Sequence, residues 1–374
     1  MPELTVVVEQ LLASVPGGTG RYARQITAAL AAAPRPGWRV RTVSAWHRDL
    51  SPAVIAGADG PHRLPAGHRV LNRLWQQGLP PWVSGTSVHA TTPLAPRRRG
   101  ALVVTVHDAV PWTHPETLTP RGVRWHRAMV GRAMHRADAV VVPSAAVADD
   151  LARLYPAESD RLHVIGHGVT ALEPPADADL RRRRFGLPDG YVLVVATLEP
   201  RKGLDVLVRA MASAAVGDWH LVVVGPTGWG GVDLTAVAAQ AGLPPSRLHA
   251  IGQLGDTDLA AVLTGATVLA APSRAEGFGL PVLEAMAAGV PVVSSDAPAL
   301  VELTGGAAVV VPRDDPAALA EALAQVLGDP LAAAELAARG RVRAAGFSWP
   351  AAARALWELH GNLPAGPVAV HRPS

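Results

Sequence analysis

Residues 266–295 read ATVLAAPSRAEGFGLPVLEAMAAGVPVVSS, which combines two apolar strands with a glycine-containing loop and a helix between them. The predicted strands are 266–273 and 290–295. The predicted helix begins near Pro281, a residue suited to a first helical turn, and stops at Gly289. Apolar strands that alternate with helices are typical of a parallel sheet with helices on both faces. This stretch therefore predicts an α/β fold of the doubly wound type.

The same alternation extends in both directions along the chain. Between residues 168 and 190 it is interrupted by Pro174-Pro175 and a charged stretch without a strand, which we interpret as a linker. We therefore expect two Rossmann-like domains, 1–170 and 171–346, with a terminal helix at 347–363 that packs back on the first. The other predicted strands are 4–11, 38–45, 101–108, 139–143, 191–197, 219–225 and 247–252, and helices are predicted at 20–33 and at 144–155, the latter with Ser144 as N-cap.

Composition and length limit the class of protein. The chain has 374 residues, which is long for one core, and 49% of them are hydrophobic against 17% charged. It contains no cysteine, so disulfides, thiolate metal sites and cysteine nucleophiles are excluded. We see no basic leader at the start and no run of about 18 apolar residues. We expect a cytoplasmic protein, and contact with the inner face of the membrane stays open.

The net charge of +3 comes from 34 basic and 31 acidic side chains, so it does not indicate a nucleic-acid partner. The arginine runs 97–99 and 181–184 lack interleaved aromatic residues, and we interpret them as solvated surface. A basic helix is predicted at 119–138. It could dock on anionic lipid, but packing on the sheet with its arginines outward is the favoured interpretation.

The loop after strand 266–273 has features that a ligand site requires. Ligands of open α/β sheets bind beyond the carboxyl ends of the strands, where Glu276 lies, and the default site of a two-domain protein is the cleft between its domains. Gly277 and Gly279 allow close backbone approach, and the following helix offers free N–H groups to a phosphate or to hydroxyl oxygens. Glu284, one turn inside that helix, could accept hydrogen bonds from a vicinal diol.

A second loop, TLEPRKG (197–203), follows the first strand of the second domain. Arg201 and Lys202 precede a helix that Gly203 opens. Basic residues at a helix N-terminus oppose the helix dipole, so an anion such as a diphosphate explains them better than solvation does.

Three further segments contain glycine or histidine patterns that could serve a function. Gly18-Thr19-Gly20-x-x-Ala23 fits a dinucleotide fingerprint poorly, because the strand ends about ten residues earlier and no acidic residue follows about 20 positions on. The loop 225–231 lacks the Lys and Ser/Thr of an ATPase P-loop. His107 ends a predicted strand and is a candidate functional histidine, whereas His163 and His167 are interpreted as structural. We identify no metal motif.

The segment EGFGLPVLE (276–284) resembles the signature of retaining glycosyltransferases of family four, which have the GT-B fold. The residues that follow, AMAAGVPVVSSDAPALVEL (285–303), are similar to the same family. The 197–203 loop resembles its basic donor-phosphate motif in a mannosyltransferase-like form. It departs from that motif in having Ala196-Thr197 where many members have Gly-Arg, so Arg201 and Lys202 would act without a further cation.

The resemblance implies a role for each matching residue. Glu276 would contact the transferred sugar and Glu284 the nucleotide ribose, while Arg201 and Lys202 would hold the diphosphate. Other implied contacts are His107 with the donor sugar, Gly17 and Gly18 with donor phosphates and acceptor, the amides of Phe278, Gly279 and Leu280 with sugar hydroxyls and phosphate, and Leu254 near the base.

The implied activity is retaining transfer of a hexosyl group from a nucleotide-diphospho-sugar, with GDP-mannose favoured and UDP-sugars open. The acceptor would be a glycan, a lipid-linked glycan or a small molecule, and no metal or other cofactor is expected. Two alternatives stay open: a catalytically silent GT-B subunit that binds a partner enzyme, and an NAD(P)-dependent oxidoreductase, which the length of the glycine loop opposes. Oligomeric state cannot be read from the sequence.

Overall fold

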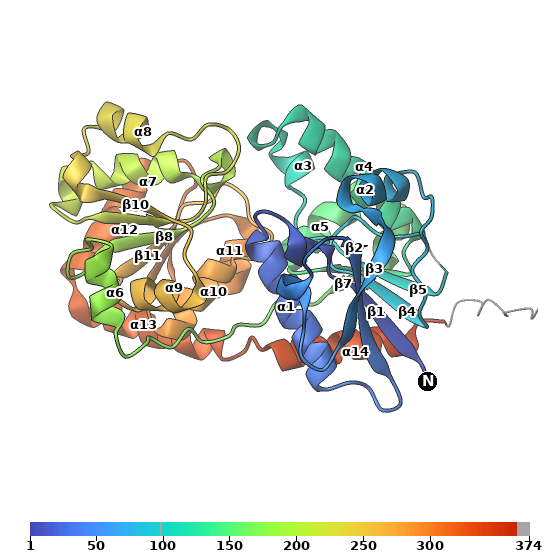
Figure 1. Ribbon diagram of the computed structural model, residues 1–374. Helices are drawn as coiled ribbons and strands as arrows, with labels where there is room; N and C mark the ends of the chain where they lie inside the picture. Colours follow the sequence, from blue (N-terminus) through green and yellow to red (C-terminus); the bar gives the residue numbers. More distant parts are fainter. Residues whose placement is uncertain (98, 365–374) are drawn as a thin grey trace, which may run out of the picture. The chain divides into compact units, whose positions relative to one another are not determined.

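The computed structural model describes residues 1–97 and 99–364, which form two compact units (Figure 1). Among the described residues, the first unit comprises 1–112, 120–168 and 348–364, and the second comprises Thr113–Thr119 and Val169–Phe347. The chain thus visits the second unit briefly at Thr113–Thr119, enters it again at Val169 and returns to the first unit at Ser348.

Within the described residues, the first unit contains a seven-stranded sheet in the order β3-β2-β1-β4-β5-β6-β7, and every neighbouring pair is parallel. Its strands are β1 (Glu3–Val7), β2 (Arg39–Trp46), β3 (Asp59–Gly67), β4 (Ser87–Ala90), β5 (Ala101–Thr105), β6 (Ala139–Val142) and β7 (Leu162–Val164). Its helices are α1 (Gly17–Ala32), α2 (His68–Gln76), α4 (Pro120–Arg136), α5 (Ala145–Leu154) and α14 (Trp349–Asn362), with α3 (Val110–Thr113) at the boundary between the units.

The second unit repeats the design with a six-stranded parallel sheet in the order β10-β9-β8-β11-β12-β13. Its strands are β8 (Val192–Val195), β9 (Leu221–Val224), β10 (Leu248–Gly252), β11 (Val268–Ala271), β12 (Val292–Ser295) and β13 (Val309–Val311). Its helices are α6 (Ala178–Arg184), α7 (Leu204–Met211), α8 (Leu234–Ala241), α9 (Asp256–Thr264), α10 (Leu280–Ala288), α11 (Pro298–Thr304), α12 (Pro316–Gly328) and α13 (Pro330–Ala344). The predicted fold class, two doubly wound α/β sheets, is confirmed.

The central strands are short apolar runs buried on both faces. Leu221, Val222 and Val223 of β9 are at most 1% exposed, as expected for a parallel strand between two helical layers. The helix boundaries follow local chemistry: Ser144 accepts a hydrogen bond from the Val147 N–H at the start of α5, as predicted. The structure thereby places the strand carboxyl ends, and the loops that follow them, on a rigid scaffold.

Helix α14 completes the first unit. It packs against α1, where the Trp357 indole N–H donates to the Leu30 carbonyl at 3.3 Å. Further along, the His360 ring lies between the Ser87 hydroxyl at 2.7 Å and the His89 ring at 3.1 Å. Helix α14 therefore packs against strands and helices formed by the first hundred residues of the chain.

Two expectations were wrong in detail. The strand predicted at 4–11 ends at Val7, because Glu9 turns inward in a 3-10 helix and accepts a hydrogen bond from the Ala45 N–H at 2.7 Å. The interpreted linker contains helix α6, in which Arg181 forms ion pairs with Asp177 and Asp258. The arginine run there is partly paired rather than simply solvated.

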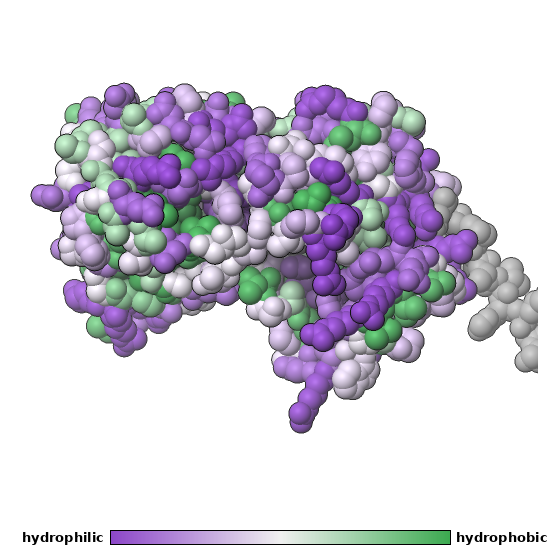
Figure 2. Space-filling model, turned by 90° about the horizontal axis from the view of Figure 1, so that it is seen from above, coloured by the Kyte–Doolittle hydropathy of each residue, from purple (hydrophilic) through white to green (hydrophobic). Residues whose placement is uncertain are grey.

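The face of the molecule in Figure 2 is mostly hydrophilic, and its hydrophobic residues form small separate patches. No helix in the described ranges has the length and hydropathy to cross a membrane.

Candidate functional site

A cluster of charged side chains lies beyond the carboxyl ends of β8 and β11. Arg201 and Lys202 belong to the 3-10 helix Pro200–Lys202 after β8, and Glu276 follows β11. The Lys202 ammonium donates to Glu276 Oε1 at 2.6 Å, and the Arg201 guanidinium donates to Glu276 Oε2 at 3.2 Å. The three side chains are only 12–17% exposed. The sequence predicted all three as site residues, and the structure brings them together.

Two more groups complete this cluster. Ser273 donates its hydroxyl to Glu276 Oε1 at 2.7 Å, and Glu199 accepts from Arg201 at 2.9 Å. Two cations thus face two carboxylates, so the cluster is close to neutral. A diphosphate would have to draw Arg201 and Lys202 away from Glu276 or share their remaining N–H groups.

Burial and charge act against each other on the ionisable groups. Burial tends to raise the pKa of Glu276, but the charges of Lys202 and Arg201 outweigh it and lower the pKa to about 2. Burial and the charge of Arg201 lower the pKa of Lys202, despite its bond to Glu276. Glu276 is therefore an ionised carboxylate at neutral pH, suited to accepting hydrogen bonds rather than to donating a proton.

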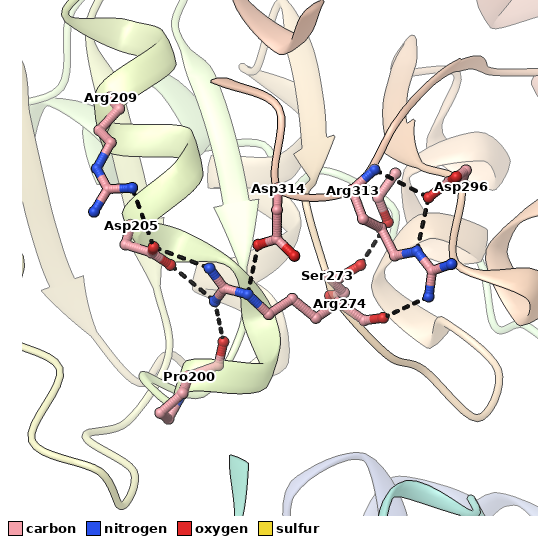
Figure 3. A network of polar contacts seen from close by, with 9 residues as sticks. Pro200, Asp205, Arg209, Ser273, Arg274, Asp296, Arg313 and Asp314 are labelled. Carbon is pink, nitrogen blue, oxygen red and sulfur yellow. Dashed lines mark hydrogen bonds and ion pairs between the residues drawn. The ribbon is translucent and has the colours of Figure 1, made fainter. Parts of the chain in front are cut away.

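Arg274 holds the two loops of the site together (Figure 3). Its guanidinium makes two bonds to Asp205 at 2.9 and 3.0 Å, one to Asp314 at 2.6 Å and one to the Pro200 carbonyl at 2.6 Å. Its backbone N–H donates to the Arg201 carbonyl at 2.8 Å. Arg274 therefore fixes the position of the loop that carries Lys202 relative to the loop that carries Glu276.

A second arginine continues this network. Arg313 binds Asp296 and also donates to the Arg274 carbonyl at 3.2 Å (Figure 3). The sequence analysis missed Glu199, Ser273, Arg274 and Arg313. Ser273 and Arg274 stand immediately before Ala275-Glu276, so their place at a strand end was a usable signal. Arg313 lies far along the chain from these residues, and the sequence around it gives no signal of a role at the site.

Two glycines shape the helix starts at the site. Gly203 has φ +63° and precedes α7, and a Cβ there would lie 2.1 Å from the Pro272 carbonyl oxygen. Gly279 has φ +103° and precedes α10, where a Cβ would meet Leu300 at 2.6 Å. Both positions require glycine because of backbone angle and close approach together. They allow the loops after β8 and β11 to pack tightly around the ion cluster.

The remaining residues predicted in the second unit lie on the same helix or on neighbouring loops. Helix α10 runs from Leu280 to Ala288 and ends at Gly289, as predicted. Glu284 is 6% exposed, so it is not a solvated surface carboxylate, and Phe278 is 7% exposed and packs edge-on against Phe347. Leu254 follows β10 and is half-buried. The roles of Phe278, Leu280, Glu284 and Leu254 stay predictions.

His107 lies just beyond β5 in the first unit. Its Nε2 donates to the Thr91 carbonyl at 2.9 Å, because a carbonyl can only accept, so Nδ1 is left as the acceptor atom of a neutral ring. Burial lowers the pKa of His107 below its ordinary value, which favours this neutral form. The Tyr22 ring lies edge-on at 5.0 Å and holds the imidazole in place.

The other predicted residues of the first unit are Gly17 and Gly18, which form the first turn of α1. Gly17 has φ +59°, and no atom lies within 4 Å of the position of a Cβ. That open space is compatible with approach of a ligand to the backbone. His167, interpreted as structural, is buried and stacks on Trp349 with ring centroids 6.0 Å apart.

A cavity of about 350 Å³ opens beside the cluster, between the 3-10 helix and α8. Glu199, Pro200 and Arg274 line it, but none of the predicted site residues does. No group of three or more His, Cys, Asp or Glu residues in the described part of the chain could hold a metal ion.

Two family models match the chain in succession. The model described as Glycosyltransferase Family 4 matches residues 16–171, and the model described as Glycosyl transferases group 1 matches residues 177–343. The chain belongs to the family-four glycosyltransferases of the GT-B fold. The second match contains the ion cluster, and the first contains His107 and the glycines of α1.

Curated relatives agree with this membership. The family-four chain is 36% identical over 247 residues to a D-inositol 3-phosphate glycosyltransferase of Salinispora arenicola, covering 60% of this chain and 55% of the relative. It is 29% identical over 261 residues to the O-antigen chain mannosyltransferase B of Escherichia coli, covering 68% of each. It spans about half the length of the inositol 3-phosphate glycosyltransferases that it matches.

Solved structures share the fold of this family-four member over nearly its whole length. Sucrose-phosphate synthase from Thermosynechococcus elongatus has a TM-score of 0.74 at 24% identity, covering 96% of this chain and 98% of that one. Anabaena HepE in complex with UDP and glucose has a TM-score of 0.75 at 19% identity, covering 97% and 100%.

Proposed function

We propose that this chain transfers a hexosyl group from a nucleotide-diphospho-sugar to an acceptor hydroxyl. The observation that carries the proposal is the buried cluster of Lys202, Arg201 and Glu276 at the carboxyl ends of β8 and β11, in a chain that belongs to family four. The cluster offers both kinds of group that such a donor requires, cations for the diphosphate and a fixed carboxylate for sugar hydroxyls.

In the proposed reaction, Lys202 and Arg201 turn from Glu276 toward the diphosphate. Their charge stabilises the negative charge that develops on the leaving group as the glycosidic bond breaks. Glu276, ionised because its pKa is about 2, holds the sugar without forming a bond to it. The acceptor oxygen forms the new bond on the same face, and its proton passes to the departing diphosphate. The anomeric configuration is retained, and no metal is required.

The other predicted residues take supporting roles in this proposal. Neutral His107 would accept a hydrogen bond from a sugar hydroxyl through Nδ1. Glu284 would accept from the ribose diol. The amides of Phe278, Gly279 and Leu280 would face sugar and phosphate oxygens, Gly17 and Gly18 would admit phosphate and acceptor, and Leu254 would lie near the base.

Mannose from GDP-mannose is the donor that we favour. The mannosyltransferase-like loop 197–203 and the O-antigen mannosyltransferase among the relatives support mannose. Because HepE is solved in complex with UDP and with UDP-glucose, uridine-diphosphate sugars are the alternative donors to be tested. The acceptor would be a glycan, a lipid-linked glycan or a small polyol, and the names of the inositol 3-phosphate glycosyltransferases make inositol phosphates the first small molecules to include.

The proposal is tested by a donor-by-acceptor screen with GDP-mannose, UDP-glucose and UDP-N-acetylglucosamine, with and without EDTA. We expect release of nucleoside diphosphate and a product whose NMR coupling constants show the donor's anomeric configuration. Inversion would contradict same-face transfer, and loss of activity in EDTA would contradict metal independence. Nucleotide binding without turnover of any donor would favour the silent subunit, and binding of NADP alone would favour an oxidoreductase.

The first prediction concerns the cluster itself. Glu276→Ala and Lys202→Ala should each lower kcat/KM at least about tenfold, equivalent to about 1.4 kcal/mol, because each removes a group that contacts the donor. Glu321→Gln, an exposed carboxylate on α12, is the matched control and should leave turnover unchanged. Near-normal turnover of both cluster variants would show that the reaction centre lies elsewhere.

A further inference from the structure

A second cavity, of about 460 Å³, lies in the first unit between helices α2 and α4 and the chain that follows β4. Its volume is within the range of small-molecule sites, roughly 300–1,000 Å³. It shares no residue with the predicted donor and acceptor contacts. Its floor is apolar and its rim is basic, and these two features together suggest the chemistry of a ligand.

The floor consists of side chains from three elements that are buried in the core of the first unit. Leu102 and Val104 come from β5, Met129 and Ala133 from α4, and Trp75 from α2, and each is at most 4% exposed. The cavity therefore reaches the apolar core itself, and a polar ligand alone would leave this surface without a partner. A hydrocarbon chain would cover it.

The rim carries three arginines, Arg97, Arg132 and Arg136, and the lining contains no Asp or Glu. Arg132 donates to the Trp75 carbonyl at 3.3 Å, and the Arg97 guanidinium lies 5.9 Å from the Trp82 ring. Within the residues that the structure describes, none of the three forms an ion pair with a carboxylate, unlike Arg39 and Arg153 of the same unit. Three cations without a carboxylate partner around one cavity are complementary to a multiply charged anion, and guanidinium groups match phosphate oxygens geometrically.

We propose that this cavity binds a single amphiphile that has a phosphate headgroup and one apolar chain. The phosphate would lie among Arg97, Arg132 and Arg136, and the chain would run over Met129 and Leu102. The inference goes beyond the proposed transferase activity and does not depend on it, since the cavity belongs entirely to the first unit and to residues without a role in that reaction.

The test is calorimetric titration of the whole chain with monodecyl phosphate below its micelle concentration. We expect one site per chain. Inorganic phosphate and decyl maltoside, which each supply one half of the ligand, should bind at least tenfold more weakly. Equal binding of inorganic phosphate would reduce the cavity to an anion site, and equal binding of decyl maltoside would reduce it to an apolar one; either result overturns the proposal.

The double variant R97Q/R136Q tests the rim, because both residues are exposed. It should weaken binding of monodecyl phosphate at least tenfold. The control R121Q/R124Q removes two exposed arginines of α4 outside the cavity and should bind normally. Unchanged affinity in R97Q/R136Q, or equal loss in both double variants, contradicts the proposal. Should R97Q/R136Q fold poorly, titration of the wild type in 0.5 M NaCl replaces it, and affinity that is insensitive to salt contradicts the rim's role.

Discussion

Glu276 makes the stability of the protein depend on pH in a defined direction. Its pKa is about 2 in the folded chain and ordinarily about 4.5, so the ionised form stabilises the fold above pH 4.5 and that contribution is lost as the pH falls toward 2. We predict that the wild type loses up to about 3 kcal/mol over this window relative to Glu276→Gln. The figure is an upper bound, because the lowered pKa of Lys202 shows that burying its charge has a cost.

Urea unfolding of both proteins between pH 2 and pH 6 measures this difference. Other carboxylates titrate in the same range, so the comparison with the variant isolates the contribution of Glu276. Glu321→Gln, which changes an exposed carboxylate, should give a curve parallel to that of the wild type. A pH-independent difference between wild type and Glu276→Gln would contradict the strong pairing of Glu276.

The same residue should also affect nucleotide binding. The Glu276 carboxylate accepts hydrogen bonds from the Lys202 ammonium at 2.6 Å and from the Arg201 guanidinium at 3.2 Å. It therefore competes with any diphosphate for these two cations. We predict that Glu276→Gln binds GDP or UDP about five times more tightly than the wild type, about 1 kcal/mol, while it transfers sugar more slowly. Isothermal titration with the nucleoside diphosphate alone measures the effect, and weaker binding by the variant would contradict it.

At the scale of the secondary-structure elements, Gly203 couples the loop after β8 to the loop after β11. Gly203→Ala should cost at least about 2 kcal/mol more than Gly186→Ala. Both glycines have φ near +64°, but a Cβ at 203 would lie 2.1 Å from the Pro272 oxygen, whereas no atom lies within 4 Å of one at 186. Denaturant unfolding of the two variants separates two contributions to the loss of stability: Gly186→Ala measures the cost of the backbone angle alone, and Gly203→Ala adds the cost of the clash with Pro272. Equal losses would mean that the contact with Pro272 is relaxed without cost.

The elements also show what a sequence can predict. Pro281 and Gly289 bound α10 as expected, because both residues act through local backbone preferences. The predicted end of the first strand was wrong, because Glu9 turns inward and bonds to Ala45, His47 and His68, which are distant in sequence. Helix α6 was missed although its local ion pairs, Asp177 with Arg181 and Asp179 with Arg182, were a usable signal; only its pair with Asp258 comes from another element.

In the candidate site, too, local features could be predicted from the sequence and contacts between distant residues could not. Arg201, Lys202 and Glu276 could be predicted because each stands at a strand end in a recognisable local pattern. Their mutual pairing could not, since it joins loops that are 74 residues apart. Arg274 stands two residues before Glu276, at a strand end that the sequence does show, but its role in positioning the two loops follows only from its bonds to Asp205 and Asp314.

At the scale of the whole molecule, α14 ties the end of the chain to the first unit. Trp357 is 5% exposed and donates to the Leu30 carbonyl. We predict that Trp357→Ala destabilises the first unit by about 3–5 kcal/mol and leaves the second unaffected. Hydrogen exchange should accelerate in β1 and β4 but not in β8 and β11. The exposed neighbour Glu358→Ala is the control, and equal acceleration in both sheets would contradict this assignment.

The placement of α14 has a consequence for synthesis on the ribosome. The second unit is almost continuous, from Val169 to Phe347, and its central strands are complete once those residues have left the exit tunnel. The first unit, although translated earlier, must wait for Ser348 and the helix after it before Leu30, Ser87 and His89 obtain their partners. The half that is made first is therefore finished last, and a nascent chain that stalls before residue 348 would present an uncovered apolar face to chaperones.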